Sequence, residues 1–193
     1  MSTDKDKNKS SEQVKLSRTV AHALRHAPEI YGLKLDEFGW VDLTQLIHAL
    51  KNKDQHWSNI STEDLIQIVD SREKQRFELN GTQIRAIYGH SFTAPINYPS
   101  AHPPPLLYHG TTAIFAKAIM ETGLLPMQRQ YVHLSDDRET ATAVALRRTS
   151  NPVILRIDAA AANRDGIRFY KGNDRVWLTS EVDSQYIVLD VII

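Results

Sequence analysis

The segment TAPINYPSAHPPP, residues 93–105, constrains the fold more than any other stretch, because it contains five prolines. Proline lacks a backbone N–H donor and has a nearly fixed φ, so such a run forbids regular helix and weakens any central strand. We therefore expect residues 93–105 to link two lobes, at residues 14–92 and 106–193. The polar stretch at residues 1–13 is predicted to be a disordered tail.

Composition narrows the classes of function. The 23 basic and 23 acidic residues balance, so bulk charge gives no sign of an electrostatically driven nucleic-acid or membrane binder. Cysteine is absent, which excludes disulfides and thiolate metal sites. No apolar run approaches the roughly 20 residues of a membrane span, and the N-terminus has no apolar signal core. A soluble, cytoplasmic, monomeric protein is the default expectation.

The first lobe is predicted to be mainly helical. A helix with one apolar side should end near His26, because Pro28 disfavours the helical conformation at the residue before it. A second helix is expected from about Leu43 to Lys51 with Asp42 as its N-cap, and a third begins at Ser61 with a capping-box pattern. A hairpin follows around Asn80-Gly81. Three helices and a hairpin suggest a winged-helix lobe.

The hairpin allows a sharper inference. A two-residue turn at Asn80-Gly81 would place Arg76 opposite Arg85 on the exposed face. Like charges at opposed positions are destabilising, so an anion between them would explain the pair. Two solvated arginines that point apart are the alternative.

The second lobe mixes strands and helices and is predicted to be α+β. Strands are expected around residues 106–109 and 131–134, with an amphipathic helix between them that Gly123 closes. Another helix should start near Asp136. Four β-branched and aromatic segments then read as strands, namely PVILRID, GIRFY, RVWLT and QYIVLDVII.

Arg25 and His26 stand together at the end of the first predicted helix. A helix C-terminus favours cations, and the planar fork of an arginine suits phosphate, so the pair could form an anion site. It could equally be a surface pair that complements the helix dipole. His22 and His26 have a spacing that metal ligands use, but no third ligand is evident, so no metal site is expected.

Two short motifs carry a histidine at a predicted strand end. In YHGTT, residues 108–112, the bare backbone of Gly110 beside His109 would let a flat ligand approach, although an ordinary turn is the simpler interpretation. In YVHLS, residues 131–135, His133 could bind a ligand or be a satisfied core histidine. Arg147, late in its predicted helix, could reach across a cleft or extend along the surface.

Taken in order, these motifs resemble one family, the RNA 2′-phosphotransferases, also called tRNA 2′-phosphotransferases. Each motif is soft alone, but together they are specific, and they extend from about Leu16 to Leu189. The matching segments are LSRTVAHALRHAPE, GLKLDEFGWVDLTQLI, KQRFEL, IRAIYGHS, LYHGTT, RQYVHLSDD, VALRR, NPVILRID, GIRFY and VWLTS.

The resemblance implies a winged-helix RNA lobe joined to an ADP-ribosyltransferase-like lobe that binds NAD as a co-substrate. It also implies a role in tRNA splicing or RNA repair. In the implied reaction an internal RNA 2′-phosphate attacks the nicotinamide-ribose carbon of NAD and nicotinamide leaves. The 2″-hydroxyl of the ADP-ribosylated RNA 2′-phosphate then attacks phosphorus. The products are RNA with a 2′-OH and ADP-ribose 1″,2″-cyclic phosphate.

The family's site residues carry over by motif. The implied catalytic residues are Arg25, His26, Arg76 and Arg147. The implied cofactor-binding residues are His109, Gly110, Thr111, Arg129, His133, Leu134 and Ser135. The implied RNA-binding residues are Arg85, His90 and Ser91.

The chain departs from the family pattern at three places, namely Tyr88, Ala145 and Asp174-Arg175. Two other functions remain open from the sequence. An ADP-ribosyltransferase could stop after the first step and cap nucleic-acid phosphate ends. A non-catalytic winged-helix module would leave YHGT and VHLS unexplained.

Overall fold

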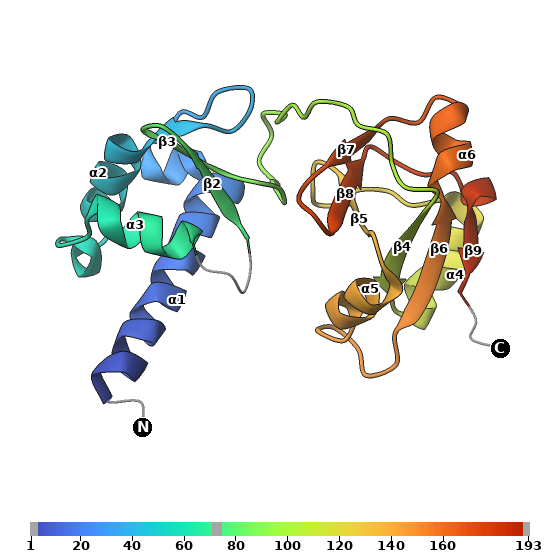
Figure 1. The fold of residues 1–193 in the computed structure, drawn as a ribbon, viewed down its shortest axis with the longest axis horizontal. Coiled ribbons are helices and arrows are strands. Elements are labelled where there is room, and N and C mark those ends of the chain that lie inside the picture. Colours follow the sequence, from blue (N-terminus) through green and yellow to red (C-terminus); the bar gives the residue numbers. More distant parts are fainter. Residues whose placement is uncertain (1–3, 71–74, 191–193) are drawn as a thin grey trace. The chain divides into compact units, whose positions relative to one another are not determined.

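The structure, a computed structural model, describes residues 4–70 and 75–190. It divides the chain into two compact units, Met1–Asn97 and Tyr98–Ile193, whose elements are drawn in Figure 1. The described part of the first unit combines helices with a three-stranded antiparallel sheet of order β1-β3-β2. That of the second combines helices with a six-stranded antiparallel sheet of order β7-β8-β5-β4-β6-β9. The predicted α+β class is confirmed.

The first unit is built around one apolar core. Its elements in chain order are α1 (Asp4–Arg25), η1 (Pro28–Tyr31), β1 (Val41–Asp42), α2 (Leu43–Lys53), η2 (Gln55–Trp57), α3 (Thr62–Val69), β2 (Phe77–Asn80) and β3 (Gln83–Ala86). Local chemistry sets the helix starts: the side chain of Asp42 accepts from the backbone N–H of Thr44, and Ser61 and Asp64 form a reciprocal capping box. Fully buried side chains from all three helices and both long strands meet in this core, including Leu24, Leu46, Leu65, Phe77 and Ile84.

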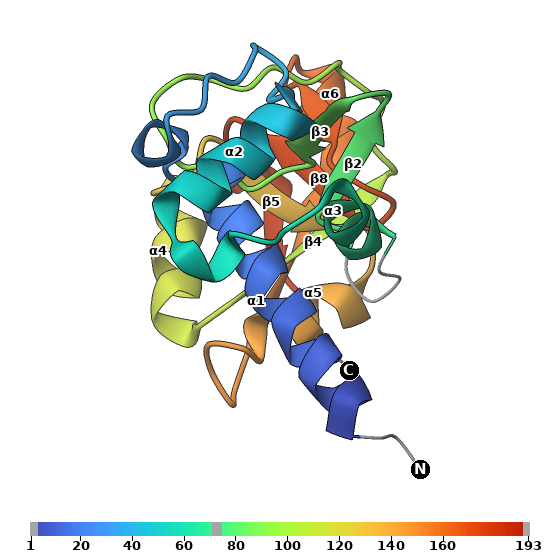
Figure 2. The same ribbon diagram turned by 90° about the vertical axis from the view of Figure 1, so that its left-hand side faces the viewer.

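The beginning of α1 differs from the expected tail. The helix starts at Asp4, so the stretch predicted to be disordered at residues 1–13 is helical from there on, and residues 1–3 lie outside the described residues. In both views α1 continues past α2 and α3 toward the N-terminus (Figure 2). The polar composition that suggested disorder is also compatible with a helix, because Lys, Glu and Gln are good helix formers.

The hairpin turn lies one residue later than predicted, so the partner of each residue in the ladder is shifted by two positions. Asn80 pairs with Gln83, so the turn residues are Gly81 and Thr82, and only Gly81 has a positive φ, of 58°. This pattern is that of a type II′ turn, which needs glycine at its first central position. Arg85 therefore lies opposite Glu78, with which it forms an ion pair, and not opposite Arg76. The inference of an anion held between two opposed arginines is wrong.

The proline segment is shared between the two units. Ile96 is buried in the first unit, and the backbone N–H of Asn97 donates to the carbonyl of Glu37. After the boundary, the backbone N–H of Ala101 donates to the carbonyl of Phe169, and the ring of Tyr98 lies edge-on to Tyr131 at 5.4 Å. The crossing between units is thus the Asn97–Tyr98 bond, and most of the predicted linker, residues 93–105, is anchored on one side or the other.

The second unit surrounds its sheet with helices. Its elements are β4 (Leu106–Thr111), α4 (Ala113–Thr122), β5 (Val132–Ser135), α5 (Arg138–Ala145), β6 (Val153–Asp158), α6 (Ala159–Arg164), β7 (Phe169–Lys171), β8 (Val176–Thr179), η3 (Ser184–Tyr186) and β9 (Ile187–Leu189). The side chain of Thr112 caps α4, which ends at Gly123 as expected. Residues Leu107, Leu155 and Ile157 are fully buried in the core of this unit.

Gly110 is required by a helix that packs on its strand. A Cβ at position 110 would lie 2.8 Å from Cβ of Ala145 and would clash with the backbone oxygen of Ala141, both in α5. On the side of Gly110 where a side chain would stand, α5 therefore fills the space that was expected to admit a flat ligand. The helix also ends sooner than expected: Ala145 is its last residue, and Arg147 and Arg148 lie in the turn that follows.

Adding a methyl group at this contact tests the packing. We expect Gly110→Ala to lower the free energy of unfolding by about 1–3 kcal/mol, because a well-packed contact has no room for it. Urea denaturation of the variant against the unmodified chain measures the loss. Adding Ala145→Gly should restore little stability, because the carbonyl of Ala141 remains in the way. A midpoint equal to that of the unmodified chain would show that α5 does not pack as described.

Candidate functional site

Arg25 and Arg76 are brought together in the first unit. Nη2 of Arg25 donates to the backbone oxygen of Arg76 at 2.9 Å, and the same oxygen accepts the backbone N–H of Ile87 at 3.0 Å. Nη1 of Arg76 donates to Oγ of Ser17 at 2.8 Å. Two guanidinium groups from residues far apart in the sequence thus lie beside the C-terminal half of α1, each oriented by a neutral acceptor.

His26 belongs to the same cluster. Its Nδ1 is 2.8 Å from Oγ of Ser91, and the backbone N–H of Ser91 donates to the carbonyl of Arg25, also at 2.8 Å. The ring is on the exposed side of the chain just after α1. Because the hydroxyl can donate or accept, it holds the imidazole in place through either protonation state. We name these four residues, Arg25, His26, Arg76 and Ser91, the arginine–histidine cluster.

Aromatic rings flank the guanidinium of Arg25. Its Cζ is 5.5 Å from the ring centroid of Tyr88 and 5.9 Å from that of Phe77. A cation over an aromatic face is attracted by the ring quadrupole. The tyrosine that departs from the family pattern therefore helps to position a predicted catalytic arginine.

The side chains of Arg85 and His90, two of the three predicted RNA-binding residues, contact other residues of the first unit. The guanidinium of Arg85 is paired with Glu78, donates to the carbonyl of Phe38 at 3.1 Å and lies 4.5 Å from the ring centroid of Trp40. His90 is only 2% exposed, and its ring lies edge-on to Phe92. Both side chains are engaged within the first unit, whereas Ser91 is exposed and contacts His26.

In the second unit, His109 and His133 are linked. Nδ1 of His109 lies 3.0 Å from the backbone oxygen of His133, so this nitrogen carries the hydrogen and Nε2 carries the lone pair. Burial lowers the pKa of His109, with a smaller contribution from the positive charge of Arg148 in the same direction. A neutral imidazole is therefore fixed on β4 in one tautomer and orientation.

The ladder between β4 and β5 is short at this point. Among the described residues, Tyr108–Ser135 is the one pair in register between these strands, whereas β4 pairs with β6 from Leu106 to Thr111. Beyond Tyr108, the two strands are joined by the His109 side chain instead of by a continued ladder. The predicted residues His109, Gly110 and His133 lie at this break.

The remaining predicted residues of the second unit differ in accessibility. Leu134 and Ser135 are buried in β5, where they pair with Trp177 and Val176 of β8. Thr111 ends β4 and is half-buried. Arg129 is exposed in the turn before β5 and Arg147 is exposed after α5.

Sequence reasoning missed Ser17, which holds Arg76. A signal was present: Ser17 follows Leu16 on the buried side of α1 and is 8% exposed. A hydroxyl in that position needs a hydrogen-bond partner, because burying it unpaired is costly.

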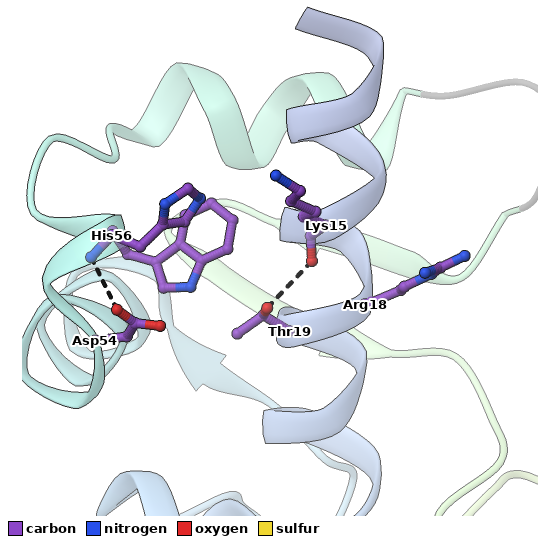
Figure 3. A pocket seen from close by; sticks show the side chains of 6 residues that line it. Lys15, Arg18, Thr19, Asp54 and His56 are labelled. Atoms are coloured by element: carbon purple, nitrogen blue, oxygen red, sulfur yellow. Dashed lines mark hydrogen bonds between the residues drawn. The ribbon is translucent and has the colours of Figure 1, made fainter. Parts of the chain in front are cut away.

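An open groove of about 530 Å³ lies elsewhere on the first unit, between α1 and η2 (Figure 3). Lys15, His56 and Asp54 line it. The first two pair with Glu12 at 2.8 and 2.9 Å, while Asp54 caps the backbone N–H of His56. Of its charged lining residues, Lys15, His56 and Asp54 are compensated within the protein, whereas Arg18 forms no ion pair with a described acidic residue. None of the predicted site residues lines the groove.

The described residues contain no cluster of three or more His, Cys, Asp or Glu arranged to hold a metal ion. Within the same residues, no helix has the length and apolar character needed to cross a membrane.

Comparison with known proteins identifies the family. The model of the RNA 2′-phosphotransferase (Tpt1/KptA) family matches residues 11–181. The chain belongs to the RNA 2′-phosphotransferase family. It is 49% identical over 173 residues to a probable RNA 2′-phosphotransferase of Acetivibrio thermocellus, covering 90% of this chain and 94% of the relative.

Other relatives carry the same name. A probable RNA 2′-phosphotransferase of Bacillus thuringiensis is 44% identical over 95% of this chain and 98% of its own. One of Streptomyces coelicolor is 45% identical over 90% and 93%. The resemblance predicted from the motifs is confirmed, and membership makes the chain a transferase that removes 2′-phosphate from RNA.

The buried histidine gives a pH prediction for this RNA 2′-phosphotransferase. Folding lowers the pKa of His109 from its ordinary value of about 6.5. At a pH below about 6.5, the histidine of the unfolded chain therefore binds more protons than that of the folded chain. Its contribution to stability is therefore complete above about pH 6.5 and is lost as the pH falls toward the folded pKa. Each unit of lowering is worth about 1.4 kcal/mol.

We expect His109→Gln to flatten this part of the profile of unfolding free energy against pH, measured by urea denaturation between pH 5 and 8. The exposed His102 of the same unit supplies the control, and His102→Gln should retain the profile of the unmodified chain. Equal profiles for all three proteins would contradict burial of a neutral His109.

Proposed function

We propose that this RNA 2′-phosphotransferase removes an internal RNA 2′-phosphate with NAD as the second substrate. The products would be RNA with a 2′-OH, nicotinamide and ADP-ribose 1″,2″-cyclic phosphate. The observation that carries the proposal is the arginine–histidine cluster, in which Arg25 at the end of α1 bonds the backbone of Arg76 and the adjacent His26 bonds Ser91.

The cluster suits a phosphate dianion. Arginine forks stabilise the charge that collects on phosphate oxygens during phosphoryl transfer. The described residues include no carboxylate in an ion pair with Arg76, whose guanidinium donates to the neutral hydroxyl of Ser17. His26, held by Ser91, would accept the proton that the ADP-ribose 2″-hydroxyl loses as it attacks phosphorus and would return it to the departing RNA 2′-oxygen.

The second unit offers a place for NAD. The break in the ladder between β4 and β5 makes main-chain groups near Gly110 and His133 candidates for bonding a carboxamide, and His109 is held there as a neutral acceptor. NAD, when bound, would supply an electrophilic ribose carbon with nicotinamide as its leaving group. Arg129 and Arg147, both exposed, would contact the negatively charged phosphates.

The order of elements supports an RNA-binding role for the first unit. Three helices followed by the β2–β3 hairpin, with β1 completing the sheet, is the arrangement expected of a winged helix. The proposal also includes the role in tRNA splicing or RNA repair that the family resemblance implies. We further propose that the protein acts in the cytoplasm as a monomer.

The direct experiment incubates the protein with NAD and a short RNA that bears one internal 2′-phosphate. We expect equimolar nicotinamide, dephosphorylated RNA and cyclic phosphate, which mass spectrometry distinguishes. Nicotinamide release with the phosphate still on the RNA would favour an ADP-ribosyltransferase that caps phosphate groups. No NAD-dependent product would refute the proposal.

Two substitutions test the assigned arginines. Arg76→Ala and Arg147→Ala should each slow release of the cyclic phosphate by about 10²–10³-fold, the usual cost of one electrostatic donor. Nicotinamide release should fall less, because the phosphate enters the first step already charged. Both products are measured in a single-turnover assay.

Ser17→Ala supplies the matched control for Arg76, because it removes the hydroxyl partner and leaves the guanidinium in place. We expect it to cost less than about tenfold, since a neutral hydrogen bond is worth about 1 kcal/mol. Normal turnover by Arg76→Ala, or an equal loss in Ser17→Ala, would contradict a direct role of Arg76.

A further inference from the structure

The exposed face of α1 carries cations that lead away from the arginine–histidine cluster. Residues 18, 22 and 25 are spaced by four and three positions, so they lie along one side of the helix, and His26 adjoins them. Arg18, His22 and His26 are exposed and Arg25 is half-buried. The basic stripe, Arg18–His22–Arg25, thus extends from the cluster toward the N-terminal half of α1.

Arg18 is the arginine of this stripe to which the proposed function assigns no role. Ion pairs engage the basic residues Lys15, His56, Arg85, Arg138 and Lys171. None of the described acidic residues pairs with Arg18. Arg18 also lines the groove between α1 and η2, and Figure 3 shows its side chain extending from α1 on the side away from His56.

The stripe has the length needed to follow a polynucleotide. Arg25 is seven positions after Arg18, a rise of about 10.5 Å along the helix. One strand of a nucleic acid places a phosphate about every 3.4 Å of duplex axis. Arg18 therefore stands about three phosphates away from a phosphate bound at Arg25.

We propose that Arg18 binds a phosphodiester of the RNA that flanks the reactive 2′-phosphate, and that α1 thereby acts as the docking surface for the RNA backbone. The inference rests on the proposed function for the position of the 2′-phosphate. An RNA backbone is the occupant that fits, because it presents repeated negative charge next to the reactive group. A protein whose basic and acidic residues are equal in number needs a local cluster of positive charge to bind RNA.

The kinetic test varies RNA length. With a 2′-phosphorylated dinucleotide, Arg18→Ala should leave KM and kcat unchanged. With an RNA extended by six nucleotides on each side, it should raise KM about three- to tenfold at unchanged kcat, as expected for one exposed charge-assisted contact. Arg18→Lys should restore most of the loss, because a phosphate accepts a point charge.

Lys15→Ala is the matched control. It removes one positive charge about a turn of α1 away from Arg18, and the Lys15 side chain is already paired with Glu12. We expect a KM for the long RNA within about twofold of the unmodified value. An equal effect of Lys15→Ala and Arg18→Ala, or an effect of Arg18→Ala that does not depend on length, would overturn the proposal.

A binding measurement separates this proposal from the proposed function. Fluorescence anisotropy without NAD follows affinity for the long 2′-phosphorylated RNA against salt concentration. Arg18→Ala should reduce the slope of log affinity against log salt by about 0.7, the value for one single-strand phosphate contact. An unchanged slope overturns the docking surface whether or not the protein turns the RNA over. Absent turnover with a reduced slope overturns the proposed function alone.

Discussion

The hydrogen bond from Arg25 to the backbone of Arg76 is the interaction on which the first unit's site depends. It fastens the end of α1 to the start of the β2–β3 hairpin, and it does so with one of the groups proposed to bind phosphate. Tyr88 and Phe77 hold the same guanidinium from its flanks. Positioning and binding are thus combined in one side chain, and the cost of ordering it is met during folding.

In the second unit, the site depends on a position that has no room for a side chain. Gly110 lets α5 approach β4, and the residue before it, His109, replaces the missing ladder to β5 with a side-chain bond. The strand is therefore packed tightly on one face and interrupted along one edge within two residues. The sheet stays continuous at this break, because β6 continues to pair with β4 along its length.

Much of this could be predicted from the sequence, because the signals were local. Helix caps at Asp42 and Ser61, the stop after Thr122 and the α+β class all follow from short-range chemistry. The hairpin register could not be predicted, because Asn80-Gly81 is compatible with more than one turn. A shift of the turn by one residue changes the partner of every residue in the ladder. The bond between Ser17 and Arg76 joins segments that are 59 residues apart, so no local pattern identifies that partner. The N-terminal helix starts within a stretch whose composition also suits a tail.

The two apolar cores are drawn from different stretches of the chain: one uses residues between Leu16 and Ala86, the other residues between Leu107 and Ile187. Every contact that defines the first core therefore exists once the N-terminal half has been made, and none has to wait for a distant partner strand. Domains generally fold as units during synthesis. The half that carries Arg25, His26 and Arg76 can reach its native packing on the ribosome before the later sheet has emerged.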